Sequence, residues 1–343
     1  MIKSLKKFLL KIFDYGFSSF VITPLLVLFW FSTWSTFDLL SISDENKIIV
    51  FAIGLCGQFF LLYHHDVLRR IFNVENQIAF AFLSRFYVLI CGIVNICFWR
   101  LVWISYDMIS TNDDNSIILN IIQNSVILMA FKVFVNSISI PFIIAFDDDN
   151  DKNEKVPEIF SYLKKSKSDG ILFIIDCICT IVITTIIVCL WRDIWTLANN
   201  KIYSSNELYS SLTSMFIGYF VALLCFIIHP CVRALCEAFI VSRIFYHDCY
   251  VALCLFATLN IWRGLWSIFN MFIAENIAII ILINITSWLL LILLGCSNSL
   301  SIGSILIDGE RECLKFQHNY ISKLFLLEST STNVEEVKKS NEV

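Results

Sequence analysis

Charge is what this sequence has least of. Charged residues make up 16% of the 343 positions and hydrophobic residues 58%, whereas about 25% charge is usual in a soluble domain. A chain of this composition cannot supply the polar surface that a soluble domain needs. Glycine (10) and proline (4) are also scarce, which disfavours the broken helices of many transporters. The net charge of −4 argues against a basic nucleic-acid-binding protein.

Catalytic signatures are missing as well. The sequence contains no HExxH, GxSxG, P-loop or GxGxxG motif, and these motifs carry the commonest metal, nucleophile and phosphate chemistry. The acidic stretch 147–158 has the spacing of a calcium loop, but Lys152 stands where the sharp turn requires glycine. We interpret it as a solvated linker. We expect no enzyme activity, no catalytic residue, no cofactor and no metal site.

Apolar stretches of membrane-spanning length are abundant. Eight of them come close to the 20 or so residues that cross the hydrocarbon core: 17–38, 48–67, 79–102, 117–146, 170–191, 209–229, 247–266 and 276–298. The fourth is longer than a perpendicular span, so we expect it to tilt, to kink near Pro141 or to project into the cytosol. The predicted fold is an all-α, polytopic membrane bundle of eight transmembrane helices.

The distribution of basic residues predicts the orientation. With the N-terminus inside, 19 of the 25 lysines and arginines fall in cytosolic segments, and five fall in the outer loops. Loops rich in lysine and arginine generally stay on the cytosolic side of the membrane. The sequence therefore predicts an integral membrane protein, in the plasma membrane, with both termini in the cytosol.

Tryptophan reveals an internal repeat. Eight of the nine tryptophans form four pairs with the same spacing: Trp30 and Trp34, Trp99 and Trp103, Trp191 and Trp195, Trp262 and Trp266. The extended pattern is W-R-x-x-W-x-x-x-[D/N]. Its arginine is Arg100, Arg192 or Arg263 in three copies, and Phe31 replaces it in the first. Since all four copies end odd-numbered spans, spans one to four and spans five to eight are predicted to be parallel repeats.

The repeat divides the chain into five predicted parts. Residues 1–16 form a basic, amphipathic cytosolic arm, 17–146 the first membrane half and 147–169 a charged cytosolic linker. Residues 170–302 form the second half. Residues 303–343 begin with an amphipathic helix and end in a polar tail that we expect to be disordered.

Two interpretations of the tryptophan motif stay open. Residues at i and i+4 share a helix face, so each pair forms one indole stripe near the outer headgroups. Such stripes are typical of a plain aromatic belt. Four ordered copies with arginine at a fixed offset also suit a platform that binds a partner or a small ligand. We predict that each arginine meets a carboxylate, a carbonyl or an indole of another helix instead of only lipid phosphate, with Asp38, Asp107 and Asp193 as the first candidates.

Three polar residues inside the predicted spans are candidates for an ion or substrate path. Lys132 lies in span four, Asp176 in span five and His229 in span six. Ionisable residues within membranes are costly and are functional candidates for that reason. The alternative is a structural pair or a lysine in a protein-lined cavity.

The tandem helix ends Arg100-x-x-Trp103, Arg192-x-x-Trp195 and Arg263-Gly264-Leu265-Trp266, together with the span count, resemble the Fuseless family of invertebrate membrane proteins. The resemblance implies a non-enzymatic scaffold or accessory protein of the presynaptic membrane that organises voltage-gated calcium channels. The implied partners are the lipid bilayer and calcium-channel subunits or other presynaptic membrane proteins. A small-solute transporter or channel and an orphan receptor with an outer tryptophan and arginine layer are the alternative functions.

Overall fold

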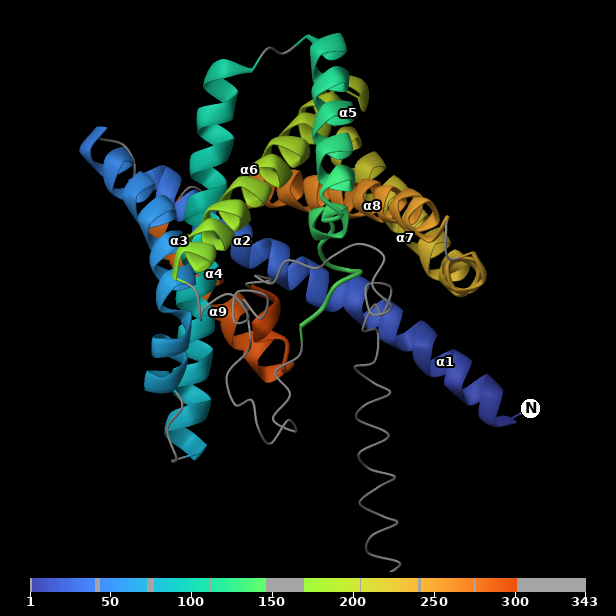
Figure 1. Cartoon of the computed structure of the whole chain (residues 1–343), viewed down its shortest axis with the longest axis horizontal. Helices are drawn as coiled ribbons and strands as arrows, with labels where there is room; N and C mark the ends of the chain where they lie inside the picture. Colours follow the sequence, from blue (N-terminus) through green and yellow to red (C-terminus); the bar gives the residue numbers. More distant parts are fainter. Residues whose placement is uncertain are drawn as a thin grey trace, which may run out of the picture.

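The computed structural model describes residues 2–40, 44–72, 77–110, 113–145, 170–203, 205–239, 242–273 and 276–300. Within these ranges the chain is all-α and contains no strand. Its longer helices are α1 (Ile2–Phe17), α2 (Thr23–Leu40), α3 (Asp44–Phe72), α4 (Gln77–Ile109), α5 (Asp114–Ala130), α6 (Gly170–Lys201), α7 (Glu207–Ala238), α8 (Arg243–Phe272) and α9 (Ile277–Leu293) (Figure 1). The predicted linker 147–169 and the predicted C-terminal part 303–343 lie outside the described residues.

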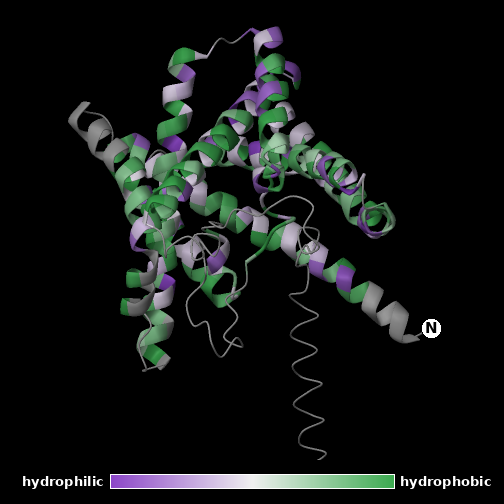
Figure 2. Cartoon of the chain, in the orientation of Figure 1, coloured by the Kyte–Doolittle hydropathy of each residue, from purple (hydrophilic) through white to green (hydrophobic). Residues whose placement is uncertain are grey.

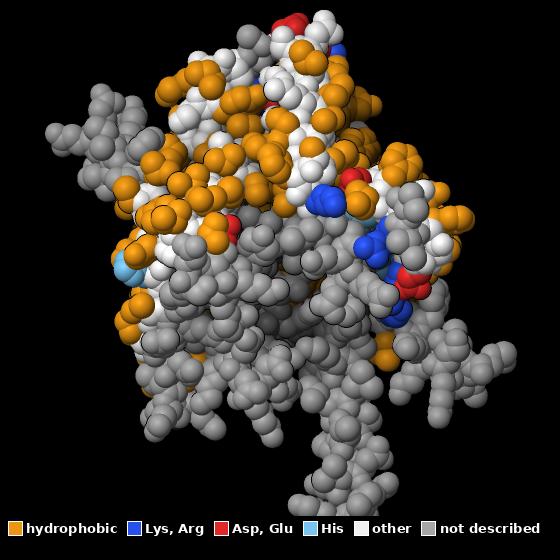
Figure 3. Space-filling model, in the orientation of Figure 1, with side chains coloured by type: hydrophobic (Ala, Val, Ile, Leu, Met, Phe, Trp, Pro, Cys, Tyr) orange, Lys and Arg blue, Asp and Glu red, His pale blue; other side chains and the backbone are white. Residues whose placement is uncertain are grey.

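Five helices of the described part are long and apolar enough to cross a membrane: Leu9–Leu40, Ile78–Ile109, Gly170–Lys201, Glu207–Ala238 and Arg243–Phe272. Apolar residues dominate these helices (Figure 2). On the face seen in Figure 3, hydrophobic side chains cover α5 and α6, where Leu119, Ile171 and Ile178 are exposed. These surfaces suit contact with a lipid bilayer. The count of eight spans and the duplication of the two halves stay predictions.

The N-terminal arm is not separated from the first span. Helix α1 continues through the π-helical turn η1 (Ser18–Ile22) into α2 without a break. Tyr15 of α1 is already buried and stacks on Phe226 of α7, with ring centroids 4.8 Å apart. The last turn of the arm therefore packs against the helical core.

The predicted fourth span is wrong in its second half. Helix α5 ends at Ala130, and the chain continues through the short 3-10 helix η2 (Phe134–Ser137) and irregular backbone to residue 145. The Lys132 and Val133 amides donate to the Met129 and Leu128 carbonyls, both at 2.9 Å. This is a Schellman cap, which ends a helix with one left-handed residue, here Lys132 at φ 56°. The cap ends the helix well before Pro141.

Helix α9 ends in the same way. The Gly295 and Cys296 amides donate to the Ile292 and Leu291 carbonyls, and Gly295 has φ 62°. The 3-10 helix η5 (Ser297–Leu300) follows. The two irregular segments then meet, because the Ala145 amide donates to Ser299 Oγ at 3.0 Å and Ser299 Oγ donates to the Ala145 carbonyl at 3.1 Å.

Helices α7 and α8 approach each other closely where small residues lie. Ser214 Oγ donates to Asn260 Oδ1 between them at 3.0 Å. A Cβ placed on Gly218 would lie 2.6 Å from the Ile261 backbone nitrogen, and one on Gly264 would lie 2.7 Å from the Ser211 carbonyl oxygen. Small residues at a helix crossing let the backbones pack this tightly.

We therefore expect Gly218→Ala to destabilise the protein by about 1–3 kcal/mol, the usual cost of overpacking. The measurement is the unfolding temperature of the purified protein in detergent. Gly16→Ala is the matched control, because a Cβ there meets nothing within 4 Å. Equal unfolding temperatures for the two variants would contradict the close helix crossing.

Candidate functional site: a tryptophan-lined pocket

The four tryptophan-bearing helices α2, α4, α6 and α8 meet around one axis. The first tryptophans of the four pairs form a closed ring, which we call the deep ring. Neighbouring ring centroids lie 5.3–5.6 Å apart and the ring planes are nearly perpendicular. Its members, in order, are Trp30, Trp99, Trp191 and Trp262. Edge-to-face contacts of this kind each contribute about 0.5–1.5 kcal/mol beyond area burial.

The second tryptophans form another closed ring, the rim ring. Its centroids are 5.7–6.1 Å apart, again with nearly perpendicular planes. Its members, in the same helix order, are Trp34, Trp103, Trp195 and Trp266. Four residues of helix advance about 6 Å, so the rim ring stacks one turn above the deep ring. Because every first tryptophan lies in one ring and every second in the other, the four helices run in the same direction.

The two rings line a pocket of about 660 Å³. The rim ring is less buried than the deep ring, in which Trp191 and Trp262 are each 4% exposed. The remaining lining residues belong to the ends of α6 and α8, to the start of α7 and to the loop between α6 and α7: Asn199, Tyr203, Ser205, Glu207, Ser210, Arg263, Ser267 and Asn270. The indoles therefore pack against one another and line a pocket, which differs from the aromatic belt of lipid-facing side chains and favours the platform interpretation.

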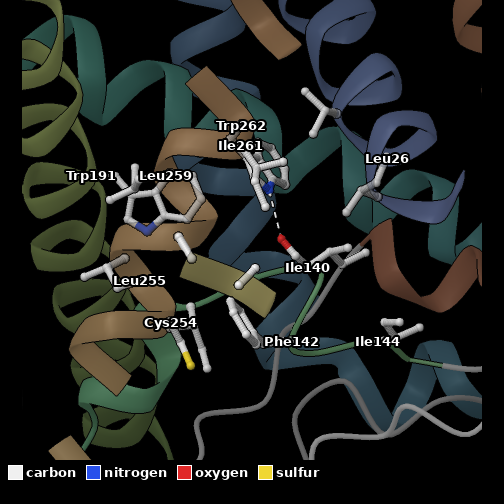
Figure 4. Packing of buried hydrophobic residues seen from close by; sticks show 14 of the residues in the cluster. Leu26, Ile140, Phe142, Ile144, Trp191, Cys254, Leu255, Leu259, Ile261 and Trp262 are labelled. Atoms are coloured by element: carbon white, nitrogen blue, oxygen red, sulfur yellow. Dashed lines mark hydrogen bonds between the residues drawn. The ribbon is translucent and has the colours of Figure 1, made fainter. Parts of the chain in front are cut away.

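The irregular segment after α5 forms the floor beneath the deep ring. Trp191 Nε1 donates to the Ser137 carbonyl at 2.7 Å and Trp262 Nε1 donates to the Ile140 carbonyl at 3.3 Å. Figure 4 shows the second of these bonds, with Leu26 and Phe142 packed in the same cluster. The helix break at Lys132 thus exposes carbonyls that fix the orientation of two deep-ring indoles.

The motif arginines connect neighbouring helices at the level of the rings. Arg100 of α4 donates through Nε to Asp38 of α2 at 2.8 Å, and its Nη2 is 2.7 Å from the same carboxylate. Arg192 of α6 donates through Nε to Asp107 of α4 at 2.6 Å. The motif's arginine therefore meets the motif's final residue on the preceding tryptophan-bearing helix. The prediction that arginine finds a carboxylate on another helix is confirmed at these two junctions.

Arg192 has a second carboxylate. Its Nη1 lies 3.3 Å from Asp193, whose side chain is completely buried. Tyr106 of α4 donates to the other oxygen of Asp193 at 3.0 Å, and its ring lies 5.5 Å from the centre of the Arg192 guanidinium. Charge-assisted bonds to two carboxylates and an aromatic contact hold this guanidinium in place.

Arg263 differs from the other two arginines. Its Nε donates to Asn199 Oδ1 at 2.7 Å and its Nη2 to Ser210 Oγ at 2.5 Å, both neutral acceptors. Nη1 is buried without a hydrogen-bond partner in the described part of the chain. A buried donor left unpaired costs about 1–3 kcal/mol. Arg263 is only 4% exposed and lines the pocket, so an uncompensated positive charge lies in the pocket wall.

At the fourth junction, between α8 and α2, the described residues show no such polar link. Phe31 occupies the arginine position, and its ring packs against Trp266 at 5.3 Å and Phe269 at 5.9 Å. The final motif residue of α8, Asn270, lines the pocket instead. The departure of the first copy from the motif therefore changes one junction from an ion pair to an aromatic contact.

The predicted intramembrane polar residues lie near the ends of three different helices. Lys132 is exposed at the end of α5 and forms no ion pair among the described residues. Asp176 lies near the start of α6, half-buried. His229 lies near the end of α7, with its ring 5.7 Å from the Tyr250 ring. The structure thus brings the tryptophan candidates together around one pocket, and these three residues are not part of the lining of that pocket.

Sequence reasoning missed several pocket residues. The floor carbonyls of Ser137 and Ile140 carry no side-chain signal, and Ser210 and Glu207 belong to a helix without the motif. Asn199 did carry a signal, because it stands where the first two copies have aspartate. That difference in charge marks the junction at which arginine reaches the pocket.

Comparison with known proteins supports the family resemblance. The model of the Fuseless family matches residues 9–301, which covers all four tryptophan pairs. Comparisons with curated proteins and with solved structures give no match. A match over most of the chain shows the family, and this chain belongs to the Fuseless family.

Proposed function

We propose that this protein is a non-enzymatic, multi-pass membrane protein that binds a small ligand in the tryptophan-lined pocket. The observation that carries the proposal is the pair of closed tryptophan rings around one pocket of about 660 Å³. Ligand pockets are typically about 300–1,000 Å³, apolar and aromatic, with a few polar groups. This pocket combines eight indoles with a small polar set at its mouth and wall.

The test uses the purified protein in detergent and its tryptophan emission, because eight of nine tryptophans line the pocket. A panel of small organic anions, neutral compounds and cations of matched size should contain binders that change this emission and raise the unfolding temperature. Trp195→Ala, which opens the rim ring, should lose both responses. A panel without any binder to the folded protein would contradict the proposal.

A presynaptic scaffold that organises voltage-gated calcium channels is the second candidate function. Family membership supports it, since the resemblance implies that role at the plasma membrane of the synapse. Tagged protein purified from neurons should carry calcium-channel subunits, identified by mass spectrometry. Their absence from a preparation that retains other presynaptic membrane proteins would argue against the scaffold. The transporter alternative has less support, because ten glycines and four prolines are few for a protein with broken helices.

The shared direction of the four tryptophan-bearing helices supports parallel repeats, and the distribution of basic residues supports the predicted orientation. We expect an epitope inserted next to Asp113, in the connection between α4 and α5, to be labelled on intact cells. An epitope at Lys165, in the linker, should be labelled only after permeabilisation. Labelling of the Lys165 epitope on intact cells would show that the orientation is inverted.

A further inference from the structure

We propose that the tryptophan-lined pocket recognises a small organic anion and that Arg263 is the residue that selects its charge. The inference rests on the proposed ligand-binding function and specifies the chemistry of the ligand. Three observations carry it: the missing carboxylate partner of Arg263, the position of Arg263 in the pocket wall, and the edge-to-face contacts that cover the faces of the indole rings.

The first observation is a difference among three equivalent junctions. Arg100 meets Asp38, and Arg192 meets Asp107 and the buried Asp193. At the third junction the same arginine nitrogen, Nε, meets the amide oxygen of Asn199. The motif's final residue is therefore a carboxylate at two junctions and an amide at the third. A buried charge without an opposite charge is unfavourable, so a bound anion would stabilise the guanidinium of Arg263.

The second observation is location. Of the three motif arginines, Arg263 lines the pocket, and Arg100 and Arg192 do not. Ser210 and Asn199, which hold its Nη2 and Nε, line the pocket as well. The side chain is thus held by two neutral hydrogen bonds, and it belongs to the lining of a space that a ligand can enter. Guanidinium groups match carboxylate and phosphate oxygens through charge-assisted hydrogen bonds.

The third observation concerns the alternative of an organic cation. A cation is bound by aromatic cages through exposed ring faces, but each indole here packs perpendicular to two neighbours, as Trp191 does against Trp99 and Trp262. These contacts already occupy ring faces with indole edges. A cation would also lie near the uncompensated charge of Arg263. Glu207, the acidic residue of the lining, is exposed at the mouth and forms no ion pair among the described residues.

The pocket therefore suits a ligand with one oxyanion and a compact apolar body. The oxyanion approaches Arg263, and the body packs against the indole surface that lines the pocket. A soluble organic carboxylate and the headgroup of an anionic lipid share this chemistry, and the test below separates these two sources.

The experiment titrates the purified protein, in neutral detergent, with three probes of the same shape: cyclohexanecarboxylate, cyclohexanecarboxamide and cyclohexylmethylammonium. These compounds do not absorb where tryptophan does, so tryptophan emission reports binding directly. We expect the carboxylate to bind about tenfold more tightly than the amide, as one charge-assisted interaction provides, and the ammonium to bind most weakly.

Asn199→Asp is the decisive variant. It supplies the carboxylate that Asp38 and Asp107 provide at the other junctions, so Arg263 becomes neutralised within the protein. We expect it to abolish the preference for the carboxylate probe, to retain binding of the amide probe and to raise the unfolding temperature. Asp107→Asn is the matched control, because it changes a junction outside the pocket where Arg192 keeps Asp193. It should leave the tenfold preference intact.

The outcomes separate the two proposals. If the amide or the ammonium binds as tightly as the carboxylate, the anion inference is wrong and the pocket function stands. If Asn199→Asp keeps the full carboxylate preference, Arg263 is not the selecting residue and the inference is likewise wrong. If none of the three probes binds and the larger panel is also negative, the pocket function itself fails.

Repeating the titration in lipid nanodiscs distinguishes a soluble carboxylate from an anionic lipid headgroup. The same titration is done in nanodiscs of phosphatidylcholine and in nanodiscs that contain phosphatidylserine. Weaker carboxylate binding in the phosphatidylserine discs, lost in Asn199→Asp, supports an anionic lipid headgroup as the occupant. Equal binding in both discs supports a soluble carboxylate. Weakening that persists in Asn199→Asp reflects surface charge and overturns the assignment of a lipid to Arg263.

Discussion

Arg192→Ala should abolish most of the folded protein that detergent extracts from the membrane. The substitution leaves Asp193, a completely buried carboxylate, without its cation at 3.3 Å, and it removes the link from α6 to Asp107 on α4. Breaking a buried ion pair by removing one partner costs about 3–5 kcal/mol, a large fraction of the stability of a typical protein. The measurement is the monodisperse fraction in size-exclusion chromatography.

Two controls make this result specific. Arg192→Lys keeps the charge but cannot reach Asp107 and Asp193 with separate nitrogens of a planar fork, so its folded fraction should lie between those of the wild type and Arg192→Ala. Lys201→Ala removes another cation of α6, paired with Asp114 of α5 where both side chains are partly exposed, and should change the folded fraction little. An Arg192→Ala variant with the yield of Lys201→Ala would show that the buried pair is dispensable.

Trp191→Ala should destabilise the protein almost as much as Arg192→Ala does, and the measurement is the unfolding temperature. Trp191 is 4% exposed, contacts Trp99 and Trp262 at right angles, and donates its Nε1 hydrogen to the Ser137 carbonyl. Replacing a buried tryptophan with alanine typically costs about 3–5 kcal/mol, because it removes apolar contact and leaves a cavity. The deep ring also loses its closure.

Phenylalanine separates the hydrogen bond from the packing. Trp191→Phe keeps an aromatic ring but leaves the Ser137 carbonyl without its donor, so we expect a loss of about 1–3 kcal/mol. Trp288 on α9 is the matched control: its Nε1 is buried and has no partner among the described residues. Trp288→Phe should therefore unfold at nearly the wild-type temperature. If both substitutions lower it equally, the bond to the floor does not matter.

Local sequence rules were sufficient for the parts of the molecule that depend on neighbouring residues. The i, i+4 spacing correctly placed each tryptophan pair on one helix face. The sequence predicted carboxylate partners on other helices for the motif arginines, and the structure pairs Arg100 with Asp38 and Arg192 with Asp107. An arginine on the outer side opposes the charge bias, and this cost indicated a partner within the protein.

The end of α5 could not be predicted in the same way. Gly295 marks the corresponding end of α9, because glycine adopts a positive φ without steric cost. Lys132 adopts the same conformation with a side chain that disfavours it. Hydropathy stays high through this segment, so the sequence favours a continuous span, whereas the Schellman cap and the bonds from Trp191 and Trp262 stabilise the break.

The sequence left open whether the tryptophans face lipid or close into rings. Spacing along one helix shows that two indoles share a face, but it does not show whether that face meets lipid or other indoles. The answer depends on how α2, α4, α6 and α8 are arranged around the axis, which involves contacts such as that between Trp30 and Trp262. Contacts of such long range have no local signature in a single sequence.

The direction of the arginine links has a consequence for biosynthesis. Each arginine donates to an acceptor on a helix that is made earlier: Arg100 to Asp38, Arg192 to Asp107 and Arg263 to Asn199. A chain inserted from its N-terminus can therefore satisfy every arginine as soon as its helix enters the membrane. An arginine at position 31 would instead have its acceptor, Asn270, on the last of the four helices. It would remain an unpaired charge in lipid until that helix is made. Phe31 removes that intermediate, since its contacts with Trp266 and Phe269 need no ionic partner while the rest of the protein is being made.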